Sequence, residues 1–189
     1  MISGIKLFVG LGNIGDKYVA TRHNAGFWWI NQIAVQTNTQ FSVDAKFFGV
    51  VGKLDLDKYL LKPSTYMNDS GKAVAALSNY YKITPAEILV VHDELDLPPG
   101  SAKLKFGGGH GGHNGLKDIH SALGTPDYWR LRLGIGHPGN RNEVINFVLK
   151  APTPDENDAL QASIYAACGV FDFMLKGEFE SAMLKLHTK

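Results

Sequence analysis

A chain of 189 residues has the length of one domain, and its apolar share of 44% is usual for a soluble globular fold. The single cysteine, Cys168, excludes an internal disulfide, and no apolar run reaches the roughly 18 residues that a membrane-spanning helix needs. The first residues, MISGIKLFVGLGN, lack the basic segment and the long apolar run of a signal peptide. We therefore expect one domain over residues 1–189, no membrane segment and a cytoplasmic location.

Strand and helix patterns alternate along the chain. Short apolar or alternating runs predict strands over residues 5–10, 47–54, 58–62, 87–93, 101–106 and 129–135. Apolar residues at helical spacing predict helices over residues 24–36, 70–82 and 116–123, and one or two more from residue 154 onward. The tail carries an apolar stripe: Leu160, Ile164, Ala167 and Phe171. This alternation predicts an α/β fold with a central mixed β-sheet flanked by helices.

The net charge is only +1, but the basic residues are unevenly distributed. Residues 97–150 hold seven lysines and arginines against three acids, whereas residues 151–189 hold three basic residues and six acids. An excess of positive charge in one segment is typical of a protein that binds a phosphate-bearing partner. Ordinary variation in surface charge would give the same pattern and is an equal alternative at this point.

The loop after the first predicted strand reads GLGNIG, residues 10–15, and matches the G-x-G-x-x-G pattern of dinucleotide-binding folds. Such folds place an acid about 20 residues further on to hold the ribose, but no Asp or Glu lies between Asp16 and Asp44. The third glycine should also open a helix directly, yet residues 16–26 intervene. A dinucleotide site is therefore disfavoured, although the loop still brings Asn13 close to a ligand.

The segment TRHNAG, residues 21–26, places His23 beside Asn24 at the N-terminus of the first predicted helix. The positive end of the helix dipole disfavours an imidazolium ion, so we expect His23 to stay neutral there. A neutral imidazole accepts a proton, as a general base must. A histidine that only forms a hydrogen bond near the helix end would show the same pattern.

Acids cluster where the predicted strand over residues 87–93 emerges: Asp93, Glu94 and Asp96. Ligands of open α/β sheets bind at the carboxyl ends of strands, so Asp93 is placed to orient His23. Asp93 could instead bind a metal together with a nearby histidine: His92, His110 or His113. The chain has no helical H-E-x-x-H pattern and no second cysteine to support that alternative.

The stretch FGGGHGGHNG, residues 106–115, contains six glycines. Glycine loses the most backbone freedom on folding, so a loop this rich in glycine lowers the stability of the protein and indicates a functional requirement. Lys103 and Lys105 precede it two residues apart, which places both on one face of a strand. Backbone amides of glycine loops bind anions, and the paired lysines favour a phosphate-bearing ligand over a plain flexible turn. A Walker loop is excluded, because no G-K-[ST] sequence follows.

Asn68, in the segment STYMNDSGKA, precedes the helix that Ser70 begins. Its amide would either donate a hydrogen bond to a developing oxyanion or cap the helix. Attack by a side chain is poorly supported, because Cys168 lies in an amphipathic helix and no G-x-S-x-G motif occurs. Water is therefore the expected nucleophile if the protein is a hydrolase.

The ordered set of these motifs resembles the bacterial peptidyl-tRNA hydrolase family. The matching segments extend from about residue 6 to about residue 149: GLGNIG with Tyr18, TRHNAG, TYMNDSG, HDELDLPPG, FGGGHGGHNGLKD and RLRLGIGHPG. The helical tail matches more loosely. Ile14 stands where the family usually has proline, and Asp69 adds a charge where the family often has none. Neither departure removes a reacting group.

The resemblance implies a phosphorylase/hydrolase-like fold and hydrolysis of the ester that joins a peptide to the 3′ ribose of tRNA, which frees tRNA from prematurely released chains. It implies that His23 is the catalytic base and that Asp93 orients it. It implies that three amides hold the ester and the peptide: Asn13, Asn68 and Asn114. It places four further residues in contact with the substrate: Tyr18, Tyr66, Met67 and His113. It implies a phosphate clamp for the acceptor stem: Lys103, Lys105 and Arg132.

On this interpretation His23 draws a proton from water, and Asn68 and nearby amides stabilise the oxyanion. The loop Gly107–Gly112 would form a mobile rim over the cleft. The partner is peptidyl-tRNA, bound by a monomer through its acceptor stem, its 3′ end and the C-terminal part of the peptide, with no cofactor or metal. Three alternatives stay open: an RNA-binding protein of the same fold without hydrolysis, a metallo-esterase or peptidase that uses His92, Asp93 and His110, and a nucleotide-dependent oxidoreductase.

Overall fold

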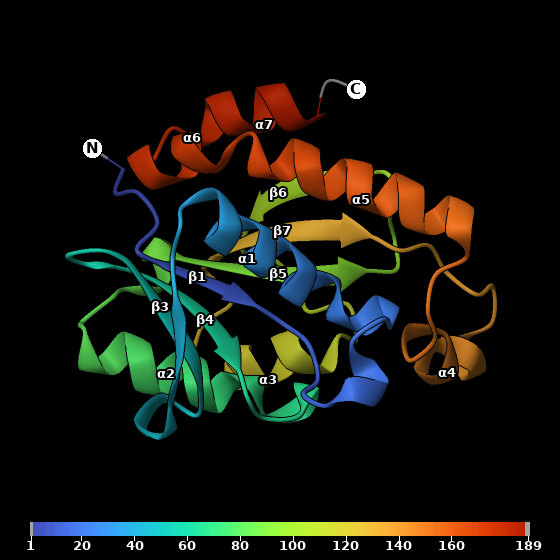
Figure 1. Cartoon of the computed structure of the whole chain (residues 1–189), viewed down its shortest axis with the longest axis horizontal. Helices are drawn as coiled ribbons and strands as arrows, with labels where there is room; N and C mark the ends of the chain where they lie inside the picture. Colours follow the sequence, from blue (N-terminus) through green and yellow to red (C-terminus); the bar gives the residue numbers. More distant parts are fainter. Residues whose placement is uncertain (1, 188–189) are drawn as a thin grey trace.

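A computed structural model describes residues 2–187, which form an α/β fold around one mixed β-sheet (Figure 1). The strands in these residues are β1 (Leu7–Gly10), β2 (Phe41–Asp44), β3 (Gly49–Asp55), β4 (Lys58–Pro63), β5 (Ile88–Glu94), β6 (Ala102–Phe106) and β7 (Trp129–Gly134). Their order across the sheet is β2-β3-β4-β1-β5-β7-β6. β4, β1, β5 and β7 run parallel, whereas β3 and β6 run antiparallel to their neighbours. The predicted central mixed sheet is confirmed.

Helices cover both faces of the sheet. They are α1 (Ala25–Gln36), α2 (Ser70–Tyr80), α3 (Asn114–Leu123), α4 (Val144–Val148), α5 (Pro154–Cys168), α6 (Phe171–Lys176) and α7 (Phe179–His187). α1, α5, α6 and α7 pack on one face, and α2 and α3 pack on the other (Figure 1). The short α4 lies apart from these layers, beyond the carboxyl ends of the parallel strands (Figure 1). None of the helices within residues 2–187 combines the length and the apolar character needed to cross a bilayer.

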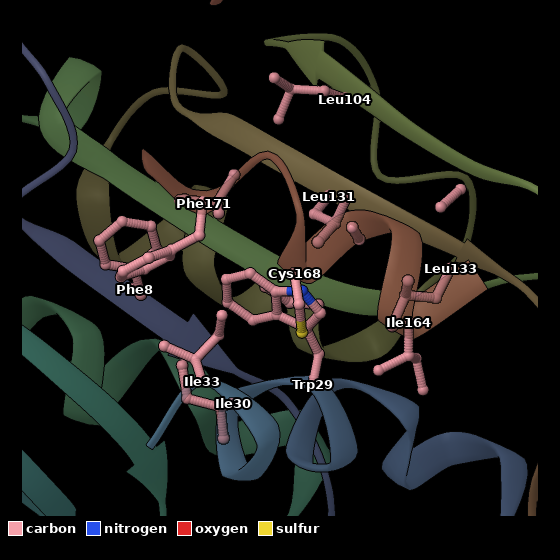
Figure 2. Close-up of a cluster of buried hydrophobic side chains, with 14 of the residues drawn as sticks. Phe8, Trp29, Ile30, Ile33, Leu104, Leu131, Leu133, Ile164, Cys168 and Phe171 are labelled. Carbon is pink, nitrogen blue, oxygen red and sulfur yellow. The ribbon is translucent and has the colours of Figure 1, made fainter. Parts of the chain in front are cut away.

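The central strands divide their side chains between two cores, because successive residues of a strand point to opposite faces. In β5, Leu89 and Val91 join the core beneath α1 and α5, whereas Ile88 and Val90 join the core against α2 and α3. Figure 2 shows the first core, in which aromatic rings of β1, α1 and α6 pack together: Phe8, Trp29 and Phe171. Burial on both faces makes β1 and β5 the rigid centre of the molecule.

The predicted elements are present, with ends shifted by no more than two residues, but some elements were not predicted. β2 is a short strand at the sheet edge whose residues are exposed or half-buried, so no apolar run marks it. α4 has five residues, too few for a clear helical period. The described tail holds three helices rather than one or two, because Gly177, with a φ of 75°, ends α6 and separates it from α7. The apolar stripe of the tail is buried as predicted: Leu160, Ile164, Ala167 and Phe171.

Two glycines bring α1 unusually close to the sheet. A Cβ on Gly26 would lie 2.3 Å from the carbonyl oxygen of Val91, and a Cβ on Gly10 would lie 2.5 Å from the carbonyl oxygen of Gly26. No real side chain tolerates such distances, so only glycine permits this approach of α1 to β1 and β5. The approach places the helical turn Arg22–Asn24, which precedes α1, against the carboxyl end of β5.

We expect Gly26→Ala to destabilise the protein by about 2–4 kcal/mol, because the added methyl group must push α1 away from the backbone of β5. Urea unfolding followed by circular dichroism measures this loss. Gly109→Ala is the matched control, since no atom lies within 4 Å of a Cβ at that position. It should change the free energy of unfolding by no more than about 0.5 kcal/mol. Equal stabilities of the two variants would contradict the close approach of α1.

Candidate active site

A cavity of about 280 Å³ lies at the carboxyl ends of β1, β4 and β5. Its polar wall combines loops that follow these strands with the glycine-rich segment: Asn13, His23, Asn68, Asp93, His113 and Asn114. Its apolar wall comes mainly from α4 and the residue after it: Val144, Ile145, Val148 and Leu149. Carboxyl ends of parallel strands are the usual place for ligands in such sheets. The structure thus gathers most of the predicted site residues around one cavity.

Asp93, near the end of β5, is the centre of the polar wall. One carboxylate oxygen lies 2.8 Å from Nδ1 of His23, and the other lies 2.8 Å from Nε2 of His113. Its side chain is only 2% exposed. Burial by itself would raise the pKa of Asp93, but the charges and hydrogen bonds of His23 and His113 outweigh it and hold the pKa well below its usual value. Asp93 is therefore an ionised carboxylate that is bonded at both oxygens.

The hydrogen bonds of His113 determine which of its nitrogens carries the proton. Nδ1 accepts the backbone N–H groups of Gly115 at 3.1 Å and Leu116 at 3.3 Å, and so caps α3. This explains why α3 starts at Asn114, two residues before the predicted start. An accepting Nδ1 holds no proton, so Nε2 is the N–H that donates to Asp93. The second oxygen of Asp93 is thereby occupied by a fixed donor.

His23 bonds to the remaining oxygen of Asp93. A carboxylate only accepts hydrogen bonds, so Nδ1 of His23 donates and Nε2 keeps its lone pair. Burial lowers the pKa of His23, but the charge of Asp93 and the hydrogen bond to it raise the pKa by more, to above the ordinary value of 6.5. The helix dipole, from which we expected a neutral His23, is thus not the main influence on its pKa, because the adjacent carboxylate acts in the opposite direction. The result is a more basic imidazole.

The same three side chains form a possible metal site, since their ligand atoms all lie within 4.8 Å of one another. A metal at Nε2 of His113 would require a proton on Nδ1, and that nitrogen already accepts two backbone N–H groups. The hydrogen bonds therefore fit a protonated Nε2 and do not fit a metal. Of the three histidines considered from the sequence as metal ligands beside Asp93, His113 belongs to this cluster, whereas His92 and His110 do not belong to it within residues 2–187.

His92, next to Asp93 in β5, is buried in the wall between two cavities. Its Nδ1 lies 2.8 Å from the carbonyl oxygen of Asp93 and donates to it. Burial, with a smaller contribution from the charge of His113, lowers the pKa of His92 to about 3. His92 therefore stays neutral and is a structural neighbour of the carboxylate.

Asn13 is held at its backbone by the side chain of Asn24. Its N–H donates to Asn24 Oδ1 at 2.8 Å, and its carbonyl oxygen accepts from Asn24 Nδ2 at 2.9 Å. The side-chain oxygen of Asn13 accepts the backbone N–H of Met67 at 2.8 Å, which leaves Nδ2 as the donor available to the cavity. Asn68 and Asn114 are exposed at the edge of the cavity. Asn68 does not cap α2, whose N-cap residue is Asp69, so the capping alternative is excluded.

The aromatic residues of the predicted cleft lie near its mouth. Tyr66 and the buried Met67 line the cavity. Tyr18 contacts the exposed Tyr66 edge to face, with ring centroids 6.5 Å apart, but is not itself a lining residue. The GLGNIG loop is followed by a helical turn at Asp16–Tyr18 rather than by a long helix, unlike a dinucleotide-binding loop. Ile14 is exposed there and contributes no side chain to the cavity wall.

The residues of the predicted phosphate clamp lie on one face of β6 and β7. Lys103 is exposed on β6 and stands directly opposite Arg132 in the antiparallel β6–β7 pair. Lys105, two residues further along β6, lines a second cavity of about 220 Å³ together with Arg132, and this cavity shares His92 and His110 with the first. Nε of Arg132 donates to Glu94 at 2.8 Å, so part of its charge is already paired.

The glycine-rich segment needs glycine because four of its residues have φ values between 59° and 96°: Gly107, Gly108, Gly111 and Gly112. Arg130 of β7, which is 2% exposed, ties the segment to the sheet. Its guanidinium donates to the carbonyl oxygens of Gly109 at 2.6 Å and Gly108 at 2.8 Å. Gly111 and Gly112 border the cavity, as expected of a rim. The rim is therefore attached at its first half.

Sequence reasoning overlooked three contributors to the site. The apolar wall of α4 has a visible signal, because residues 144, 145, 148 and 149 are apolar at helical spacing. Arg22, beside His23, and Arg130 are buried, although arginine is normally exposed. The alternation of Arg130 with Leu131 and Arg132 in β7 indicates that both arginines share a face. The burial of Arg22 has no signal in the sequence that we recognise.

Comparisons with known proteins agree with this geometry. The profile of the family described as peptidyl-tRNA hydrolase matches residues 7–189. The peptidyl-tRNA hydrolase of Methylobacillus flagellatus is 60% identical over 100% of this chain and 99% of its own length. That of Variovorax paradoxus is 54% identical over 97% of this chain and 89% of its own.

Comparison with solved structures leads to the same family. The crystal structure of peptidyl-tRNA hydrolase from Acinetobacter baumannii superposes with a TM-score of 0.96 at 43% identity, covering 100% of this chain and 97% of the other. A match of this extent in both sequence and fold exceeds what a shared architecture alone would produce. The chain therefore belongs to the peptidyl-tRNA hydrolase family.

Proposed function

We infer that this chain hydrolyses peptidyl-tRNA, separating the peptide from the 3′ ribose of tRNA. Family membership over nearly the whole chain supports the reaction. The observation that carries the mechanism is the carboxylate of Asp93, bonded at one oxygen to His23 and at the other to His113. This arrangement leaves Nε2 of His23 as a basic nitrogen on the wall of the cavity, which is what activation of water requires.

Water is the nucleophile in the proposed reaction. Nε2 of His23 takes a proton from a water molecule as the water oxygen attacks the ester carbonyl carbon. The negative charge that develops on the carbonyl oxygen is stabilised by amide donors, Nδ2 of Asn13 and the amide of Asn68. When the intermediate collapses, the bond to the 3′ oxygen breaks, and His23 returns its proton to that oxygen. The products are a peptide acid and a tRNA with a free 3′ hydroxyl.

Substrate binding is proposed to use both walls of the cavity. Asn114, Tyr66 and Met67 border the polar side, where a peptide main chain finds donors and acceptors. Tyr18 extends this edge through its contact with Tyr66. The apolar wall of α4 faces the same space and would cover the less polar parts of the substrate. Asp93 remains covered by its two histidines and does not contact the substrate in this proposal.

The tRNA is proposed to lie across the second cavity. Lys105 and Arg132 would pair with phosphates of the acceptor stem, and His92 and His110, which line both cavities, would separate this region from the ester. Lys103, which stands opposite Arg132 on β6, would contact the phosphate backbone beside them. One chain supplies every group that the reaction uses, so the proposal needs only a monomer. It also places the enzyme in the cytoplasm, where its substrate is made.

The first test is hydrolysis of N-acetyl-aminoacyl-tRNA in the presence of excess chelator. We expect wild type to cleave this substrate, because the proposed reaction uses no metal. His23→Ala should lower kcat by about 10²–10⁴-fold, the usual contribution of a general base, and should still bind the tRNA. Binding without cleavage by wild type would contradict the enzymatic function. Loss of cleavage by wild type on chelation alone would contradict the metal-free mechanism.

The pH dependence of kcat/KM tests the role of Asp93. The neutral form of His23 is the active one, so activity should fall as the pH drops through the pKa of His23, which lies above 6.5. Asp93→Asn removes the charge that raises this pKa. Its acid limb should therefore move to lower pH, while the maximal rate decreases by about 10²-fold or more because the tautomer of His23 is no longer enforced.

Asp96→Asn provides the matched control for this shift, since Asp96 is an exposed acid three residues further along the chain. Its acid limb should coincide with that of wild type. An Asp93→Asn profile with an unmoved acid limb would show that the limb belongs to another group.

A further inference from the structure

α4 supplies most of the apolar wall, yet it has few attachments of its own. It is five residues long, too short to persist without tertiary contacts. Of its residues only Val148 is buried, while Ile145 is 70% exposed. Figure 1 shows it beyond the end of the sheet, outside both helical layers. Apart from Val148, which joins the core, and Val144, which packs against it, its position relative to His23 therefore depends on the contacts at its ends.

A single side chain, that of Arg22, forms the main connection at the C-terminal end of α4. Nη1 of Arg22 donates to the carbonyl oxygen of Phe147 at 2.9 Å and to that of Lys150 at 3.4 Å. Phe147 lies in the last turn of α4 and Lys150 follows the helix; a cation there is favoured by the helix dipole, and the carbonyl oxygen of Phe147 also accepts the backbone N–H of Lys150 at 3.2 Å. The guanidinium carbon also lies 3.9 Å from the centre of the Phe147 ring. The backbone N–H of Arg22 donates to the carbonyl oxygen of Lys150 at 3.0 Å.

The same guanidinium reaches α5. Nη2 of Arg22 forms an ion pair with Glu156 at 2.8 Å, and this carboxylate also accepts the backbone N–H of Thr153 at the start of α5. Arg22 is only 8% exposed, so the loss of any of these contacts would cost free energy that hydration does not recover. Arg22 precedes His23 directly. One residue thus joins the turn that carries His23, the end of α4 and the start of α5.

We propose that Arg22 is a positioning residue that sets the affinity for substrate by holding the apolar wall of α4 over the cavity. It touches no reacting atom. Without its fork of donors the end of α4 would lose its side-chain link to the turn that carries His23 and to α5, and Val144, Ile145 and Val148 would move away from the space in front of His23. The loss would fall on substrate binding rather than on proton transfer, because His23 and Asp93 keep their own hydrogen bond.

Steady-state kinetics of Arg22→Gln separate an effect on substrate binding from an effect on proton transfer. This experiment rests on the proposed hydrolysis. We expect KM to rise by about tenfold, with kcat within about threefold of wild type and an unmoved acid limb. Arg22→Lys, which keeps the charge but not the planar fork, should be intermediate and keeps the test available if Arg22→Gln fails to fold. Glu156→Gln is the matched control: it retains an oxygen for Arg22 and should raise KM by less than about threefold.

Hydrogen exchange tests the clamp without any reaction. In Arg22→Lys and Arg22→Gln, the amides of residues 144–150 should exchange at least about tenfold faster than in wild type, while those of β5 stay unchanged. A double-mutant cycle with Val148→Ala, read as the affinity for uncleaved N-acetyl-aminoacyl-tRNA in a His23→Ala background, should be less than additive, because both changes act on the same wall.

Unchanged exchange over residues 144–150, additive losses, or a fall in kcat at constant KM would each overturn the proposal. If wild type itself failed to cleave peptidyl-tRNA, the proposed function would fall, but exchange and binding would still decide the role of Arg22.

Discussion

A buried carboxylate that must stay ionised is the constraint on which the site depends. Taking Asp93 out of water costs several kcal/mol unless hydrogen-bond donors replace the lost hydration. β5 cannot supply those donors, because its own N–H groups belong to the sheet. They come instead from His23, which lies 70 residues earlier in the chain, and from His113, which lies 20 residues later. Both segments must therefore meet at the end of β5.

The rest of the fold makes that meeting possible. Gly10 and Gly26 let α1 approach the sheet so closely that the turn before it reaches the end of β5. The glycine-rich segment lets the chain leave β6, curve past the cavity and present His113 at the start of α3, while Arg130 holds its first half. The glycines thus serve two purposes: Gly10 in β1 and Gly26 in α1 permit contact between the helix and the sheet, and those of the loop permit backbone angles that other residues avoid.

These hydrogen bonds determine which nitrogen of each histidine carries a proton. His113 uses Nδ1 to cap α3, so its Nε2 proton is directed at Asp93 and cannot be exchanged for a metal without breaking the cap. Asp93 in turn directs the proton of His23 to Nδ1 and leaves Nε2 basic. Hydrogen bonds therefore connect three groups in turn: His113, which caps α3, the carboxylate of Asp93, and the base His23. The N-cap of α3 thereby influences the chemistry of His23, which lies in the turn before α1.

Sequence patterns predicted those parts of this structure whose signal is local. The alternation of elements predicted the mixed sheet, and strand ends predicted that Asp93 would meet His23, as it does. The helix dipole alone was considered for the protonation of His23, whereas the carboxylate of Asp93 raises its pKa. The role of His113 as a second donor was missed, because no sequence pattern shows that it reaches the other oxygen of Asp93.

Other features were missed because their signal is weak or non-local. α4 is too short for a clear period, and the contacts of Arg22 join residues more than 120 positions apart. Predictions therefore failed where long-range packing decides the geometry.

The most direct measurement of the central claim is the protonation of the two histidines by nitrogen-15 NMR. Long-range proton–nitrogen correlation spectra, recorded at a pH above the pKa of His23, report which imidazole nitrogens carry hydrogen. The account predicts a proton on Nδ1 of His23 and on Nε2 of His113, with Nε2 of His23 bare. A proton on Nδ1 of His113, or on Nε2 of His23 under these conditions, would contradict the account.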